Sequence, residues 1–115
     1  MAEHLDPVRI PVPGGKVIEE LAGRVATGHN NYSVARMSAP GGWDEPAQRP
    51  EFDEVTYVIS GEVIVHTDEG EQRVGAGEGI LTRAGEKVRY AAGEEGAEYL
   101  AFCVPAFSEP GAHRG

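Results

Sequence analysis

The sequence has little of several features that would otherwise classify it. It contains a single cysteine, Cys103, so no internal disulfide can form, which is typical of proteins from a reducing compartment. It has no run of about 18 apolar residues and no apolar signal core near its N-terminus. Basic residues number 10 against 19 acidic ones, and the net charge of −9 argues against nucleic acid or an anionic membrane as a partner. We therefore expect a cytoplasmic protein that binds neither.

Glycine and proline, in contrast, are abundant, with 16 and 8 copies in 115 residues. Eight or nine short strands at regular spacing, separated by turns, predict an all-β architecture that is closed or sandwiched. The length fits one domain, which we divide into an N-terminal arm over residues 1–16, a core over about 17–106 and a loose tail over 108–115. The arm carries an alternating apolar pattern interrupted by prolines, which predicts an edge strand or a lead-in. Because such an arm often crosses to a second subunit, we expect a homodimer.

Two segments leave alternatives open. Residues 16–21 fit either one helical turn or a strand. The strand over 32–37 has two faces, and either can look inward. If the face with Arg36 does so, that charge needs a carboxylate or an anionic ligand beside it. Elsewhere the sequence predicts that strand 54–59 turns at residues 60–61 into a second hairpin strand, and that residues 93–96 form an acidic turn before the last strand.

The most informative stretch runs from Gly42 to Gly61, with the sequence GWDEPAQRPEFDEVTYVISG. Its spacing resembles the first motif of the cupin family, glycine-x5-His-x-His-x3-Glu-x6-glycine, with Gln48 and Pro50 in the histidine positions and Glu54 in the glutamate position. A second cupin motif, glycine-x5-Pro-x-Gly-x2-His-x3-Asn, is matched at its glycines only. Its positions here are Gly77, Arg83, Gly85, Val88 and Ala92. The resemblance implies an antiparallel jelly-roll β-barrel. Within the family, the phrase FDEVTYVISG is most similar to the ethanolamine-utilisation protein Q type.

The resemblance also names the four positions where cupins hold a metal, here Gln48, Pro50, Glu54 and Val88. Only Glu54 is a good ligand, so we predict neither the usual transition metal nor another cofactor. One alternative is an oxygen-rich site for a harder cation, formed by Glu54 with Glu45 and Glu51.

By the same resemblance, Glu54 points into the barrel. A carboxyl group in a partly apolar cavity has a raised pKa and suits general acid–base catalysis next to a carbonyl. The alternative is that Glu54 pairs with Arg36 or Arg83, or accepts hydrogen bonds from loop amides. Gln48 and the phenol of Tyr90 are candidate ligand-binding groups of the same cavity.

Two further candidates flank the opening of this cavity. Trp43, at the start of the mouth loop, is either a wall over the opening or a core residue. Arg83 binds either a ligand carboxylate or a neighbouring acidic side chain. Cys103 lies in an apolar run and is expected to be a small buried residue.

Two functions of different classes remain. The first is a metal-independent small-molecule protein which, if catalytic, is an isomerase, cyclase or lyase working by proton transfer. The second is a non-catalytic binding or accessory module. A cavity too small for a substrate would favour the second function, and a deep pocket with a phenol or arginine near Glu54 would favour the first.

Overall fold

The computed structural model describes residues 1–108, and its regular elements are seven β-strands. They are β1 (Val8–Ile10), β2 (Val17–Ala22), β3 (Ser33–Ala39), β4 (Asp53–Thr67), β5 (Gly70–Gly75), β6 (Gly79–Thr82) and β7 (Val88–Val104). This confirms the all-β prediction. Among the described residues, no helix is long and apolar enough to cross a membrane. The part of the predicted tail beyond residue 108 lies outside the described residues.

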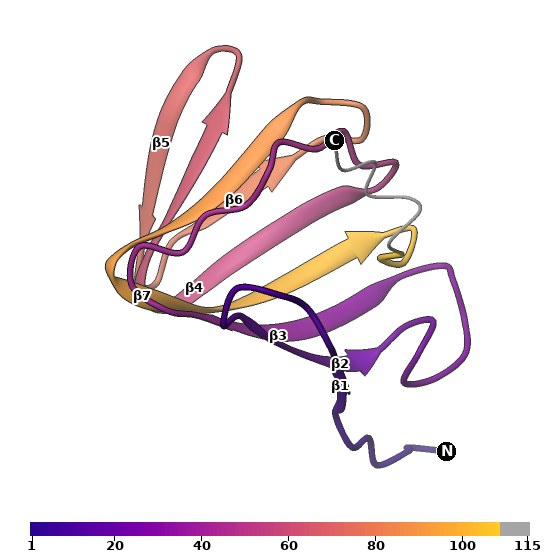
Figure 1. The fold of residues 1–115 in the computed structure, drawn as a ribbon. Helices are drawn as coiled ribbons and strands as arrows, with labels where there is room; N and C mark the ends of the chain where they lie inside the picture. The colour runs from indigo at the N-terminus through magenta and orange to yellow at the C-terminus, as the bar shows by residue number, and fades with distance from the viewer. Residues whose placement is uncertain (109–115) are drawn as a thin grey trace.

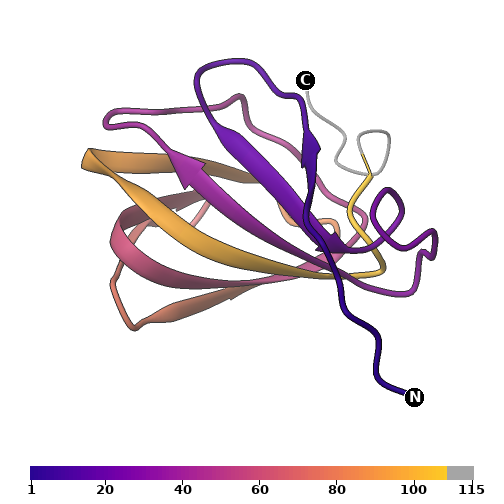
Figure 2. The ribbon, with the colours of Figure 1, turned by 90° about the horizontal axis from the view of Figure 1, so that it is seen from below.

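All strand pairs are antiparallel, in the order β1-β2-β3-β7-β4-β5, with β6 added beside β4. The first half of β4 lies between β6 and β7, and its second half lies between β5 and β7. Both long strands curve back at one end of the molecule, so their halves contribute to two facing layers (Figures 1 and 2). The apolar core fills the space between these layers, as in a jelly-roll barrel.

The two predicted turns at residues 60–61 and 93–96 are wrong, because β4 and β7 run through them without a break. Gly61 has a positive φ of 74°. A side chain there would overlap the carbonyl oxygen of Gly96 on β7, the strand that pairs with β4 at this point. The register of β4 on β7 shifts on either side of this point, which is the signature of β-bulges. The glycines therefore let two paired strands bend together instead of ending them.

The open alternatives are also decided. Residues 17–22 form a strand, β2, and β1 pairs only with it at the edge of the sheet, as the prolines predicted. The inward face of β3 is the one with Ser33, Ala35 and Met37, so Arg36 points outward. Its guanidinium donates to the Glu98 carboxylate at 2.6 Å.

The loop over residues 40–52 runs along the first half of β7 (Figure 1). It is tied there by isolated bridges between Asp44 and Ala91 and between Gln48 and Val88. In the second bridge the two residues exchange both backbone hydrogen bonds, each at 2.9 Å. The loop thereby acts as a short extra strand that closes one side of the barrel.

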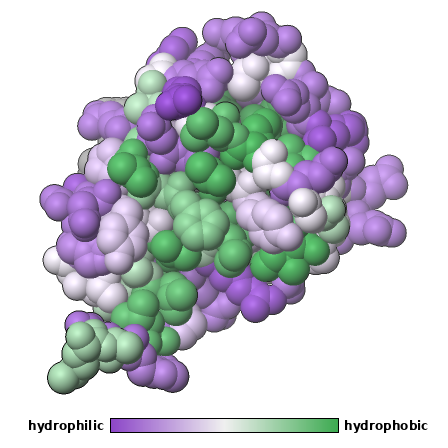
Figure 3. Space-filling view, turned by 180° about the vertical axis from the view of Figure 1, so that it is seen from behind, coloured by the Kyte–Doolittle hydropathy of each residue, from purple (hydrophilic) through white to green (hydrophobic). Residues whose placement is uncertain are grey.

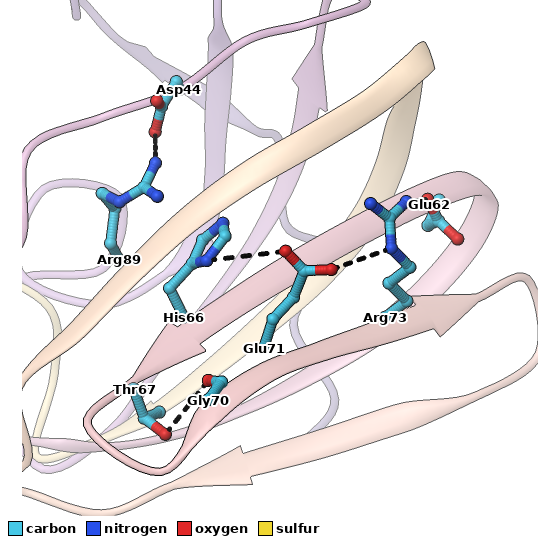
Figure 4. A network of polar contacts seen from close by, with 8 residues as sticks. All are labelled: Asp44, Glu62, His66, Thr67, Gly70, Glu71, Arg73 and Arg89. Atoms are coloured by element: carbon cyan, nitrogen blue, oxygen red, sulfur yellow. Dashed lines mark hydrogen bonds and ion pairs between the residues drawn. The ribbon is translucent and has the colours of Figure 1, made fainter.

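The outer surface is divided between charged and apolar regions. On β4 and β5, Glu71 contacts both His66 and Arg73, and Arg73 also pairs with Glu62 (Figure 4). On another face, apolar side chains gather in the middle of the surface (Figure 3). The exposed large apolar residues on β4, β6 and β7 are Val55, Tyr57, Ile59, Leu81, Phe102 and Val104.

Candidate functional site

Glu54 lies inside the barrel, on β4 between Thr82 of β6 and Cys103 of β7. Its side chain is 9% exposed. The Thr56 hydroxyl donates to its Oε2 at 3.4 Å, and the Cys103 thiol lies 3.8 Å from its Oε1. Alternation along β4 turns Glu54, Thr56 and Val58 inward and the residues between them outward, as period-2 geometry predicts.

Burial raises the pKa of Glu54 from 4.5 to about 7, because the charged form loses its hydration. The Lys16 ammonium opposes this rise and the Glu45 carboxylate reinforces it, while the Thr56 hydroxyl and the Cys103 thiol lower the pKa through hydrogen bonds. A carboxyl group with a pKa near neutrality populates both protonation states at physiological pH. Such a group is suited to give and take protons.

Tyr90 and Gln48 meet Glu54 around one inner cavity of about 20 Å³. The Tyr90 hydroxyl is 2.8 Å from the Thr82 hydroxyl, and burial, followed by the Glu54 charge, raises the pKa of this phenol well above 10. Gln48 donates from Nε2 to the Glu45 carboxylate at 2.9 Å. The structure thus brings together three of the residues that the sequence singled out.

A second hollow of about 140 Å³ adjoins the inner cavity and shares Lys16, Ile18 and Glu45 with it. We call it the mouth pocket. Its remaining lining comes from the N-terminal arm and the loop after β3, as Val12, Pro13, Gly14, Trp43, Asp44 and Pro46. A ligand too large for the inner cavity can therefore lie against Lys16 and Glu45, which also line the cavity that contains Glu54.

Lys16 is a site residue that sequence reasoning missed. Its ammonium lies 4.2 Å from the centre of the Trp43 ring and 5.5 Å from that of Tyr99, in a double cation–π contact. The signal was present, since Lys16 precedes β2 on the same alternate face as the buried Ile18 and Glu20. The turn at Gly14 and Gly15, both with positive φ, delivers it to this place.

The other sequence candidates lie as follows. Arg36 is on the outer face, and Arg83 is exposed after β6; neither lines the inner cavity or the mouth pocket. Neither arginine makes an ion pair with Glu54 that the structure records. Trp43 is both a core residue, at 9% exposure, and a wall of the mouth pocket, so its two alternatives hold together. Cys103 is buried as expected, and burial raises the pKa of its thiol.

The cupin metal positions do not fit a metal here. Gln48 and Glu54 face the cavity, but Pro50 and Val88 offer no donor atom. The oxygen-rich alternative is not assembled either, because residues 1–108 contain no group of three His, Cys, Asp or Glu side chains able to hold a metal ion. Glu51, its third member, is exposed in the loop.

A larger hollow, of about 630 Å³, lies elsewhere, over the bends of β4 and β7. It is an open depression lined largely by glycine backbone and by Glu62, Glu94 and Glu95. Its one cation, Arg73, is engaged by Glu62 and Glu71 (Figure 4). None of the residues around Glu54 reaches it, so we place the functional site at the two smaller hollows that share Lys16 and Glu45.

Comparison with known proteins agrees with this geometry. A family model described as the cupin domain matches residues 36–104, more than half of the chain. The chain belongs to the cupin family. This cupin is 47% identical over 105 residues to the protein named endoribonuclease YbeY of Myxococcus xanthus strain DK1622, covering 90% of this chain but only 36% of that protein.

Solved structures show the same fold at low sequence identity. Pac13, described as a unique nucleoside dehydratase, matches with a TM-score of 0.78 at 18% identity, covering 100% of this cupin and 92% of that chain. Variants of the Streptomyces protein have been solved with uridine. An RmlC-like cupin from Shewanella frigidimarina matches with a TM-score of 0.78 at 16% identity, covering 94% and 96%.

Proposed function

We propose that this cupin binds a small organic ligand at the mouth pocket and that Glu54 transfers a proton to or from it without a metal. The observation that carries this proposal is the buried Glu54 carboxyl, whose pKa of about 7 is set by its surroundings inside the barrel. An acid–base group works best when its pKa lies near the working pH. The donors around it, Tyr90 and Gln48, can orient a ligand by hydrogen bonds.

The chemistry is a proton transfer on carbon next to a carbonyl group. The Glu54 carboxylate removes a proton from that carbon, and the electron pair moves towards the carbonyl oxygen. In an isomerase the resulting acid returns the proton to a different atom. In a lyase a hydroxyl group on the next carbon leaves with the proton as water. A protein of the same fold, Pac13, is described as a dehydratase, which supports an elimination on this scaffold.

The test is substitution of Glu54 by glutamine, which keeps the shape and removes the titration. We expect at least a hundredfold loss of any carbon-acid exchange or elimination that the wild type catalyses. Glu69→Gln is the matched control, because Glu69 is an exposed residue in the turn between β4 and β5 and lines neither hollow of the site. Full activity of Glu54→Gln would refute the proposal.

A second function, the accessory module, is favoured by two observations. The cavity directly beside Glu54, at about 20 Å³, has room for little more than a water molecule. The Myxococcus relative matches over 36% of its length, so a domain of this kind stands there within a longer protein. The relative is named an endoribonuclease, but the net charge of −9 on this chain disfavours binding of RNA by this domain itself. The accessory module would be favoured if a ligand raised the melting temperature of the protein while no carbonyl compound was turned over by it.

We also propose a homodimer through the apolar face seen in Figure 3. Phe102, Val55 and Leu81 are consecutive cross-strand neighbours there, and each is 38–46% exposed. Because the chain carries a net charge of −9, a second copy meets the least repulsion on this uncharged row. Membership of the ethanolamine-utilisation protein Q type and a cytoplasmic location remain predictions, supported by the phrase at residues 52–61 and by the single cysteine.

A further inference from the structure

Lys16 stands at the junction of the two hollows. It lines both the inner cavity, with Glu54, and the mouth pocket, with Trp43. Of the residues that line these hollows, it is the one lysine or arginine. Lys16 is therefore in contact with both the space for a ligand in the mouth pocket and the cavity that contains Glu54.

The position of Lys16 is fixed by its surroundings. The rings of Trp43 and Tyr99 hold the ammonium by cation–π contacts at 4.2 and 5.5 Å. Gly14, in the turn before it, packs against the Trp43 ring, where an added Cβ would lie 3.6 Å from two ring atoms. An ammonium has three donors in addition to its attraction to aromatic faces, so a ligand oxygen can join its existing contacts.

Charge decides which oxygen this would be. In the mouth pocket, Asp44 is paired with Arg89 (Figure 4), and Glu45 accepts a hydrogen bond from Gln48. An anionic ligand would be repelled by two carboxylates, Glu45 and the ionised form of Glu54, and attracted by only one ammonium, that of Lys16. An uncharged carbonyl oxygen instead gains a charge-assisted hydrogen bond without adding a negative charge.

We infer that Lys16 is a catalytic residue that binds the carbonyl oxygen of a small uncharged aldehyde or ketone, while Glu54 exchanges the proton on the neighbouring carbon. This inference rests on the proposed function. As the carbon loses its proton to Glu54, the electron pair moves to the carbonyl oxygen, and the Lys16 ammonium stabilises the enolate by hydrogen bonding. Return of the proton from the Glu54 carboxyl restores the starting charges.

The experiment follows exchange of the carbon-bound protons of dihydroxyacetone in deuterated water by proton NMR, with the full chain as catalyst. We expect Lys16→Met to lower the exchange rate about a hundredfold, as removal of one oxyanion donor does in other enzymes. Lys16→Arg, which keeps the charge, should retain activity within about tenfold of wild type. Lys87→Met, at an exposed lysine, is the control and should match the wild type.

The outcomes separate the two proposals. If Lys16→Met exchanges protons as fast as wild type while Glu54→Gln does not, the role of Lys16 is refuted and that of Glu54 stands. Exchange by Glu54→Gln at the wild-type rate, or no exchange by the wild type, refutes the proton transfer and with it the role of Lys16. Faster exchange of pyruvate than of dihydroxyacetone would contradict the uncharged ligand class.

A readout independent of activity tests whether Lys16 faces Glu54. The carbon-13 signal of the Glu54 carboxyl can be assigned because it is absent from Glu54→Gln. Its chemical shift is then followed against pH in the wild type and in Lys16→Met. Removal of the ammonium in Lys16→Met should move the pKa of Glu54 further upward from about 7, because the ammonium lowers it. An unchanged midpoint would overturn the inference, since an ammonium that faces Glu54 must lower the pKa of that carboxyl.

Discussion

The ionisation of Glu54 should make the stability of the protein depend on pH in a way that Glu54→Gln abolishes. The folded-state pKa of about 7 lies above the ordinary value of 4.5, so the folded protein holds this proton more tightly than the unfolded chain does. The stability that the protonated carboxyl contributes is therefore complete below about pH 4.5. It falls as the pH rises and is lost above about pH 7.

The magnitude follows from the shift. One pKa unit corresponds to about 1.4 kcal/mol, so a rise from 4.5 to about 7 amounts to about 3 kcal/mol in total. Between pH 5 and pH 8, wild type should lose about 2 to 3 kcal/mol of unfolding free energy relative to Glu54→Gln. The other carboxyl groups titrate alike in both proteins, and the difference between the two removes their contribution.

Urea denaturation at several pH values measures this difference, with the fluorescence of Trp43 as the signal, because it is the one tryptophan and is buried. Glu69→Gln, at an exposed turn, should follow the wild-type curve at every pH. If the difference in unfolding free energy between wild type and Glu54→Gln is the same from pH 5 to pH 8, Glu54 does not titrate as its burial requires.

Three further predictions concern the fold and the surface. Gly61→Ala should lower the free energy of unfolding, measured by heat or urea, by about 3 kcal/mol, because its Cβ would overlap the Gly96 carbonyl. Gly77→Ala, at a similar positive φ but in open space, should lower it by about 1 kcal/mol. Glu20→Ala should cost about 2 to 3 kcal/mol and speed amide exchange at residues 25 and 26, whose N–H groups donate to this buried carboxylate at 2.8 Å. Val55→Glu should halve the mass measured by light scattering; an unchanged mass would refute the proposed dimer face.

The barrel was predictable because its signals repeat along the chain. The resemblance to cupins implied that Glu54 faces inward, and period-2 alternation extended that face along β4. The prolines of the arm predicted an edge strand. The predicted turns failed because a glycine with positive φ serves a turn and a β-bulge equally well. What distinguishes the two at Gly61 is its pairing with Ala97 and its close approach to Gly96, more than thirty positions away, which the local sequence does not contain.

The site was predicted in part for similar reasons. Glu54, Gln48 and Tyr90 occupy motif positions or share their faces, and the structure places all three around the inner cavity. Lys16 lies outside both motifs, and residues 16–21 left helix and strand open, so its inward face was not assigned. Arg36 was unplaced because the two faces of its strand have similar apolar content; packing of Ala35 and Met37 in the core decided the orientation.

The choice between enzyme and accessory module depends on why a carboxyl group occupies position 54. At neutral pH and above, its desolvation costs this cupin about 3 kcal/mol of stability, which an uncharged side chain of similar size would avoid. A binding module needs only a packed barrel, and a buried carboxyl group at position 54 would lower its stability without serving binding. A proton-transfer site needs that desolvated carboxyl group, because the same burial that lowers stability raises its pKa into the working range. A Glu54→Gln variant that is more stable than wild type at pH 8 and has lost proton exchange would match the enzyme. The same gain in stability with ligand binding intact and no exchange by wild type would match the module.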